Sequence, residues 1–336
     1  MGKTQGNLAV ATVGSYLPQT MDEAIKIIEG LKKQNVAVLG NGEVFVRRTP
    51  QGQVRSVKAL VALEEANGEL AIISNKAMTT AKGFYHANQI TGLSIITPQN
   101  LTLPDGKVVI NPYPVIDPES STISKIWVKK LCLGYSPTGN LVITSATLLY
   151  DIKMYLIQDL MKKVTYNRGC GRMCMEQMLT PEEKDKGIFF KVEGPLGLWV
   201  DINQPDVLKA FDTFINKKNF AERNAQTICE RVAMQKHPAL AHIAYVNAEG
   251  PDKKRRAVVT LVGFVNDFSQ RQLEEIAEQA ERGEEIKING QKTEVEVINI
   301  QGEATHEDMV VEVDDEEKLI SETETNVEGA SQGQLF

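Results

Sequence analysis

Cysteine and histidine are scarce in this sequence, with four residues of each. Four cysteines are too few to hold a chain of 336 residues together with disulfides, so we expect reduced thiols. Cys170 and Cys174 form a C-x3-C pair that could bind zinc together with Cys132 and Cys229. Those ligands are spread over about 100 residues, whereas zinc sites use closely spaced pairs, and we therefore predict no metal.

Long hydrophobic runs are absent as well. The apolar segment at 148–160 is interrupted by Asp151 and Lys153, and no segment reaches the length that spans a bilayer. Residues 1–14 contain no apolar block followed by a small-residue cleavage site. These absences predict a cytoplasmic protein that does not enter a membrane.

The motifs of nucleotide-driven enzymes and hydrolases are also missing. The sequence has no G-x-x-x-x-G-K-[ST] loop, no G-x-G-x-x-G turn, no H-E-x-x-H pair and no G-x-S-x-G serine. We therefore expect neither an ATP-driven mechanism nor a cofactor, and we do not predict an enzyme. His237 stands before Pro238, which is typical of a histidine at a helix end rather than of a catalytic base. Glu193 and Asp201, on possible strands, leave a metal-dependent nuclease as an alternative.

Charge is distributed unevenly along the chain. Residues 301–336 contain eleven acidic residues and one lysine, so the net charge of −7 leaves +3 on the first 300 residues. Residues 123–175 contain eight basic residues against two aspartates. The acidic end has few apolar residues, and we expect it to be disordered.

Hairpin and helix signals alternate along the body. The turn LPDGK at 103–107 combines a proline that presets φ with a glycine that accepts positive φ. A strand, a turn and a second strand are indicated by ISKIWVKKLCLGY, SPTGN and LVITSA, and residues 148–164 then follow a helical period. Residues 54–65 stay unassigned. Further helices are expected after Thr20, after Pro205, from about Phe220 to His237 and after Ser269, which forms a capping box with Gln272. Strands are expected at 44–48, 70–74, 243–246 and 257–265, with a hairpin turn at Asn289-Gly290.

This pattern predicts an α+β fold whose strands lie in antiparallel hairpins. We divide the chain into an N-terminal α/β segment at 1–98, a nucleic-acid-binding α+β core at 99–300 and a disordered acidic tail at 301–336.

The binding function assigned to the core rests on basic and aromatic residues. In an extended strand, Lys125, Trp127 and Lys129 share one face, so ammonium groups can meet phosphates while the indole stacks on a base. The alternative is that Trp127 belongs to the core and the lysines form a solvated rim. Two further basic clusters favour binding, because such clusters beside an acidic tail are typical of nucleic-acid proteins. The second cluster is Lys162, Lys163, Arg168 and Arg172, and the third is the loop with Lys253, Lys254, Arg255 and Arg256. The predicted interface comprises Lys125, Trp127, Lys129, Lys130, Lys153, Lys162, Lys163, Arg168, Arg172, Lys253, Lys254, Arg255 and Arg256.

Residues 75–265 resemble proteins carried by phages and integrated elements. The resemblance lies in TTAKGFYHANQITGLSI, in NPYPVIDPESSTISKIWVKKLCLGYSPTGNLVITSATLLYDIKMYLIQDLMKK and in AERNAQTICERVAMQKHPAL. These segments are similar in organisation to the ATP-independent single-strand annealing recombinases of the RecT and Redβ type. The resemblance implies a curved sheet backed by helices, assembly into homo-oligomeric rings or filaments, and a basic groove that lays out single-stranded DNA for pairing. A structural protein of a phage particle remains an alternative.

The last five residues, QGQLF, fit the pattern Q-x-x-L-F. This pattern resembles the peptide by which bacterial replication and repair proteins dock on the sliding clamp. Gln332 would satisfy a polar spot, while Leu335 and Phe336 would fill an apolar pocket. An acidic tail ending in phenylalanine also resembles the tip of bacterial single-strand binding proteins. The sequence therefore predicts the sliding clamp or a single-strand binding protein as a partner.

Overall fold

The structure is a computed structural model, and it describes residues 43–49, 52–73, 75–264, 268–288, 290–305 and 308. The helix expected after Thr20 and the predicted docking residues Gln332, Leu335 and Phe336 lie outside these residues. Within the described chain, helices combine with largely antiparallel sheets, which confirms the predicted α+β class.

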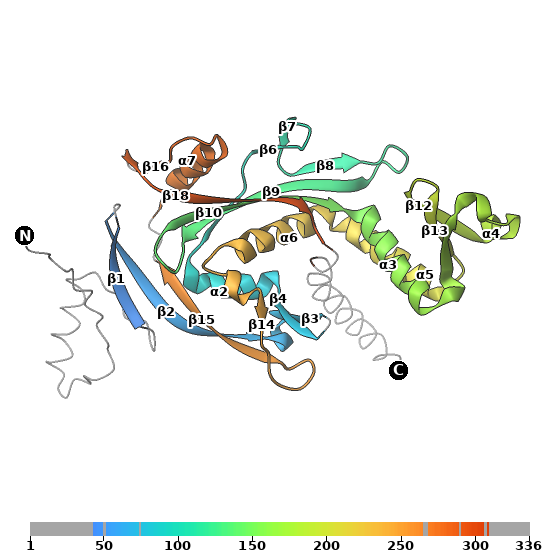
Figure 1. Ribbon diagram of the computed structural model, residues 1–336, viewed down its shortest axis with the longest axis horizontal. Coiled ribbons are helices and arrows are strands. Elements are labelled where there is room, and N and C mark those ends of the chain that lie inside the picture. The colour runs from blue at the N-terminus through green and yellow to red at the C-terminus, as the bar shows by residue number, and fades with distance from the viewer. Residues whose placement is uncertain are drawn as a thin grey trace, which may run out of the picture.

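A central five-stranded sheet is built around the predicted hairpin. Its strands are β5 (Ser94–Ile96), β8 (Tyr113–Ile116), β9 (Ile123–Tyr135), β10 (Leu141–Asp151) and β18 (Val295–Glu303). β9 and β10 pair antiparallel, and in the turn between them the Ser136 N–H donates to the Asn140 carbonyl at 2.8 Å. β18 pairs parallel with the outer side of β10, while β5 and β8 pair with different parts of β9. The long strands curve over the helices beneath them (Figure 1).

Two helices, α2 (Ala81–Thr91) and α6 (Ala221–Lys236), lie between this sheet and a second layer of strands (Figure 1). Val128 and Leu148 of the sheet share one core with Ile228 of α6 and with Leu63 and Leu261 of the second layer. The second layer contains one sheet of β1 (Glu43–Thr49), β2 (Gly52–Glu64) and β15 (Arg256–Phe264), and another of β3 (Leu70–Ile73), β4 (Lys76–Thr79) and β14 (Tyr245–Val246). This core contains residues from both the proposed N-terminal segment at 1–98 and the proposed nucleic-acid-binding core at 99–300.

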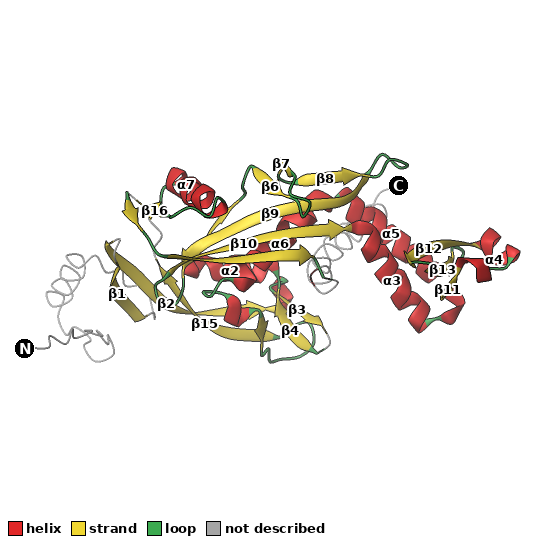
Figure 2. Cartoon of the chain, turned by 45° about the horizontal axis from the view of Figure 1, so that its top comes forward, coloured by secondary structure: helices red, strands yellow, loops and turns green. Residues whose placement is uncertain are grey.

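An arm projects from the end of the central sheet (Figures 1 and 2). Its stem is made of α3 (Ile152–Tyr166) and α5 (Pro205–Asn219), which pack together. At its tip lie β11 (Gly171–Met175), α4 (Pro181–Lys186), β12 (Gly187–Glu193) and β13 (Leu196–Asp201). Stem and tip share a smaller core that includes Leu160, Leu198 and Val207.

The helix after the hairpin begins later than the sequence period indicates. Residues 148–151 are the last residues of β10. The helix α3 begins at Ile152, because Asp151 caps it by accepting a hydrogen bond from the Met154 N–H at 3.1 Å. Tyr155 is not part of the apolar period of this segment, yet it is buried, and its hydroxyl donates to the Ala304 carbonyl at 2.6 Å. The apolar period therefore located the helix but not its first residue or the full width of its buried face.

The remaining elements cover one end of the central sheet. α7 (Gln270–Glu281) begins at the predicted Ser269–Gln272 capping box and packs Leu273 and Ile276 against Leu131 and Leu133 of β9. LPDGK joins β6 (Asn100–Thr102) to β7 (Val108–Ile110) as predicted, and a second short hairpin pairs β16 (Lys287–Ile288) with β17 (Gln291–Lys292). Short 3-10 turns occur at η1 (Glu65–Asn67), η2 (Arg168–Cys170), η3 (Glu176–Met178) and η4 (Ala241–Ile243).

Two expectations about segment limits need correction, and one segment that was left open can be assigned. The unassigned segment 54–65 lies mostly in β2, and of the strand expected at 243–246 only Tyr245 and Val246 are extended, because η4 precedes them. The tail was expected to leave the fold after Ile300. Gln301, however, continues β18, and beyond that strand the Ala304 N–H donates to the Leu149 carbonyl at 3.1 Å. The chain therefore contacts the body beyond the proposed boundary.

Candidate nucleic-acid interface

The predicted tryptophan face lies on β9. Lys125, Trp127 and Lys129 point away from α6, because the alternate residues Ile126 and Val128 are buried in the core beside that helix. Trp127 is half-buried, and its cross-strand neighbours are Tyr113 on β8 and Leu149 on β10. The Lys107 ammonium lies 5.9 Å from the centre of the Tyr113 ring. We call Lys107, Tyr113, Lys125, Trp127 and Lys129 the tryptophan face.

The two strand lysines of this face are each bound by a carboxylate. Lys125 Nζ lies 2.7 Å from Asp151 Oδ2, and Lys129 Nζ lies 2.6 Å from Glu281 Oε1 of α7. A phosphate would have to displace these carboxylates before it could pair with either ammonium. The face therefore offers aromatic rings, but much of its positive charge is compensated.

Lys130 faces the opposite way and is buried. Its ammonium donates to Thr97 Oγ1 at 2.9 Å, to Gln226 Oε1 at 3.1 Å and to Glu230 Oε1 at 2.6 Å. The Tyr85 hydroxyl donates to the other oxygen of Glu230. A buried cation with three partners stabilises the contact between β9 and α6, and this arrangement argues against contact with a phosphate.

The second predicted cluster lies along the arm. Lys153 is exposed at the start of α3, whereas Lys162, Lys163 and Arg168 lie near its far end. Arg172 on β11 makes two 3.0 Å hydrogen bonds to Glu183 of α4, and these hold the pKa of the Glu183 carboxyl at about 2. Arg172 thus joins two elements of the tip, while the other four residues spread along the stem.

The third cluster is the loop between β14 and β15. Lys253 and Lys254 are exposed, and their ammonium groups have no partner in the described part of the chain. Arg255 Nη2 lies 3.0 Å from Asp252 Oδ1, and Arg256 Nε lies 3.4 Å from Glu64 Oε1. This loop belongs to the second layer, across α2 and α6 from the tryptophan face (Figure 1). The three clusters are therefore separate surfaces and do not form one groove.

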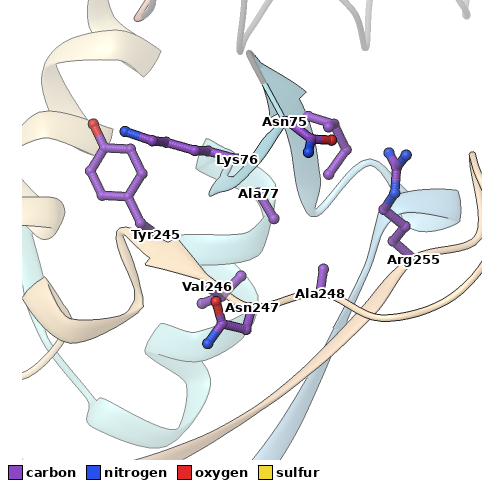
Figure 3. Close-up of a pocket in the computed structure, with 9 residues that line it drawn as sticks. Asn75, Lys76, Ala77, Tyr245, Val246, Asn247, Ala248 and Arg255 are labelled. Atoms are coloured by element: carbon purple, nitrogen blue, oxygen red, sulfur yellow. The ribbon is translucent and has the colours of Figure 1, made fainter.

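A cleft of about 550 Å³ opens beside the third cluster (Figure 3). The cleft is lined by the β3–β4 turn, the start of β4, the strand β14 and the residues that follow it, together with Arg255. We call it the tyrosine cleft. It is lined by Ile72, Asn75, Lys76, Ala77, Tyr245, Val246, Asn247, Ala248 and Arg255.

Strand register brings the main side chains of the cleft together. Tyr245 pairs with Met78 across β14 and β4, and Lys76 precedes Met78 by two residues, so Tyr245 and Lys76 share one face. Figure 3 shows the Lys76 ammonium beside the hydroxyl end of Tyr245, with Asn75 and Arg255 across the opening. Asn75 occupies the turn with a φ of 64°, a left-handed conformation that asparagine adopts more readily than most residues.

The tyrosine cleft combines an accessible ring with an uncompensated cation. The Tyr245 residue is 52% exposed, and neither its hydroxyl nor the Lys76 ammonium has a partner among the described residues. A ring beside an ammonium can stack on a base while a phosphate is bound, and the Asn75 and Asn247 amides add donors and acceptors. Of these residues, sequence reasoning selected only Arg255. A lone tyrosine in a two-residue strand gives no signal until the register with β4 is known.

The residues considered for other chemistry are separated or enclosed. All four cysteines are free and buried, and burial raises the pKa of the Cys132 thiol. Glu193 and Asp201 lie at opposite ends of the β12–β13 hairpin. His237 ends α6 as predicted, with Nδ1 accepting from the Ala239 N–H at 3.2 Å and Nε2 donating to the Val142 carbonyl at 3.3 Å. In the described ranges, no group of three histidine, cysteine, aspartate or glutamate residues is placed to hold a metal ion.

Within the part of the chain that the structure covers, no helix is long and apolar enough to cross a membrane. Comparison with protein-family models, with curated proteins and with solved structures gave no match for this chain.

Proposed function

We propose that this protein binds single-stranded DNA and promotes the annealing of complementary strands without ATP, in the cytoplasm. The observation that carries the proposal is the tyrosine cleft, where the exposed Tyr245 ring lies beside the Lys76 ammonium, which has no partner among the residues that the structure describes. The resemblance to annealing recombinases of the RecT and Redβ type extends it from binding to strand pairing.

The chemistry of the cleft favours a single strand over a duplex. Stacking on Tyr245 needs an unpaired base with an exposed face, whereas a duplex keeps its base faces covered by their neighbours. One such stack contributes about 1–3 kcal/mol. Arg255 is paired with Asp252 and Glu65, but the exposed Lys253 and Lys254 beside it in the loop can bind the backbone of the strand beyond the cleft.

The tryptophan face supplies a second place for stacking. Trp127 and Tyr113 lie directly across from each other on β9 and β8. Because Asp151 and Glu281 already bind the neighbouring lysines, we expect this face to contribute less salt-dependent affinity than the cleft. The proposed docking of Gln332, Leu335 and Phe336 on the sliding clamp or on a single-strand binding protein remains part of the proposal.

The decisive experiment measures the affinity of three variants for a labelled single-stranded oligonucleotide by fluorescence anisotropy across a salt series. Tyr245→Ala should weaken binding about 5- to 150-fold, since the stacking surface is lost. Tyr245→Phe keeps the ring and should bind like the wild type. Lys76→Ala should weaken binding and reduce the slope of log affinity against log salt by about 1.

Equal affinity of Tyr245→Ala and the wild type would remove the cleft from the interface. Annealing of complementary oligonucleotides is measured in the same buffers without nucleotide, and it should be faster with the protein than without. Addition of Mg²⁺ tests the nuclease alternative, because cleavage of the labelled strand would favour that reading over annealing.

A further inference from the structure

β18 forms one edge of the central sheet. It pairs with β10 without interruption from Val295 to Glu303, and no described strand lies on its other side. A strand in this position presents a row of outward N–H and C=O groups, and no hydrogen bond joins these to another part of the described chain. The edge is therefore a template for a further strand.

The two edges of the central sheet differ in how they are protected. The edge opposite β18 is shared by two short strands that both pair with β9. β5 is three residues long, while β8 is four residues long, carries Pro114, which has no N–H to donate, and has a register shift between Val115 and Ile116. Short length, proline and irregularity are the usual means by which an edge is kept from pairing. β18 has nine residues, VEVINIQGE, with no proline, no lysine and no register shift. Among the described residues, β18 is therefore the edge of this sheet that lacks these protections.

We propose that β18 pairs antiparallel with β18 of a second copy of this chain, with Asn299 on the two-fold axis. In this register Val297 lies across from Gln301 of the second copy, Ile298 across from Ile300, and Val295 across from Glu303. Glu296 lies across from Gly302, whose missing side chain leaves open space, because no atom lies within 4 Å of its Cβ position. No two acidic residues face each other, so the strand is complementary to itself.

The faces of the strand agree with this pairing. Ile300 packs against the core on the side of α6, and Val297 on the other side is 38% exposed. Opposite residues of an antiparallel pair lie on the same face, so the two sheets would join with their cores aligned. The product is one continuous sheet with a two-fold interface, the commonest form of a homodimer.

Disulfide trapping tests the register directly. The four native cysteines are buried, so a cysteine added on β18 is the one that reacts under native conditions. Asn299→Cys places two thiols across the axis and should give a covalent dimer on mild oxidation. Gln301→Cys is the matched control, because its two thiols would be about 14 Å apart at about 3.4 Å per residue, which is beyond disulfide reach.

A charge exchange tests the same register without a covalent bond. Val297→Lys with Gln301→Lys puts like charges across the interface twice, and it should raise the dimer dissociation constant about tenfold or more. Val297→Lys with Gln301→Glu puts opposite charges there and should restore the dimer. Sedimentation of the full chain reports the change as a return from twice 37.2 kDa to a single chain.

Any of three results would overturn the proposal. The first is equal cross-linking of the Asn299→Cys and Gln301→Cys variants, and the second is a monomer at every concentration. The third is a monomeric Asn299→Cys variant whose introduced thiol is shielded from a maleimide by another segment of the chain. No DNA is present in these measurements, so their outcome does not depend on the proposed function.

Discussion

His237 should make the stability of this protein depend on pH in a calculable way. The imidazole is fully buried at the end of α6, and burial lowers its pKa from the ordinary 6.5 to about 4. Its neutral form is fixed by two contacts, since Nδ1 accepts from the Ala239 N–H and Nε2 donates to the Val142 carbonyl. Protonation would place a charge in the core and leave the Ala239 N–H without its acceptor.

The two pKa values determine whether the free energy of unfolding rises or falls with pH. The unfolded chain takes up a proton as pH falls below about 6.5, whereas the folded chain resists protonation until about pH 4. The free energy of unfolding therefore decreases between these values and stops changing through this group below them. The difference in pKa corresponds to about 3 kcal/mol in total, of which roughly 2–3 kcal/mol is lost between pH 7.5 and 4.5.

The perturbation is His237→Asn. The asparagine oxygen can accept from the Ala239 N–H, but the side chain does not titrate. At pH 7.5 we expect the variant to be less stable by about 1–2 kcal/mol, because the bond to Val142 and part of the packing are lost. At pH 4.5 it should equal or exceed the wild type, so the two stability curves should meet.

Urea unfolding followed by circular dichroism at several pH values measures both curves. Other groups titrate equally in the two proteins, so the difference between the curves isolates His237. Parallel curves, with the same deficit at pH 7.5 and 4.5, would refute the reasoning and show that the folded chain accepts the proton at little cost.

Three further predictions concern the C-terminal part of the chain. Arg231 is 1% exposed on α6, and its Nη2 lies 2.5 Å from Asp308 Oδ1. Asp308→Ala should therefore lower the free energy of unfolding by as much as about 3 kcal/mol, because it leaves the arginine buried without its partner. Adding Arg231→Met should recover most of this loss. If Asp308→Ala unfolds at the same urea concentration as the wild type, this ion pair does not stabilise the fold. A chain ending at Asp308 should keep the wild-type unfolding transition. It should bind DNA equally or more tightly, because it lacks eight acidic residues and one lysine. A chain ending at Ile300 should be less stable, because it lacks the last residues of β18. Equal stability of the two truncations would contradict the role assigned to the end of β18. Deletion of Leu335 and Phe336 should abolish capture of the sliding clamp in a pull-down without changing the affinity for DNA. The docking peptide would be refuted if the full chain captured neither the clamp nor a single-strand binding protein.

Elements whose signals lie within a few residues could be predicted from the sequence. The SPTGN turn, the Ser269 capping box and the LPDGK turn were all located correctly, because a turn or a cap is decided by neighbouring residues. Strand alternation also placed Lys125, Trp127 and Lys129 on one face, since side chains alternate in every extended strand.

Only the tertiary structure decided what those side chains meet. Lys129 is compensated by Glu281, and Lys130 is enclosed by Glu230 of α6; each carboxylate lies far away in the sequence and reaches its lysine through the packing of a helix. Tyr245 and Lys76 become neighbours only through the register of β14 with β4. The sequence shows how many basic residues lie in 123–175, but a charge is available to a ligand only where no carboxylate is packed against it. Which charges remain free depends on contacts between distant segments, and these contacts leave no local pattern in the sequence.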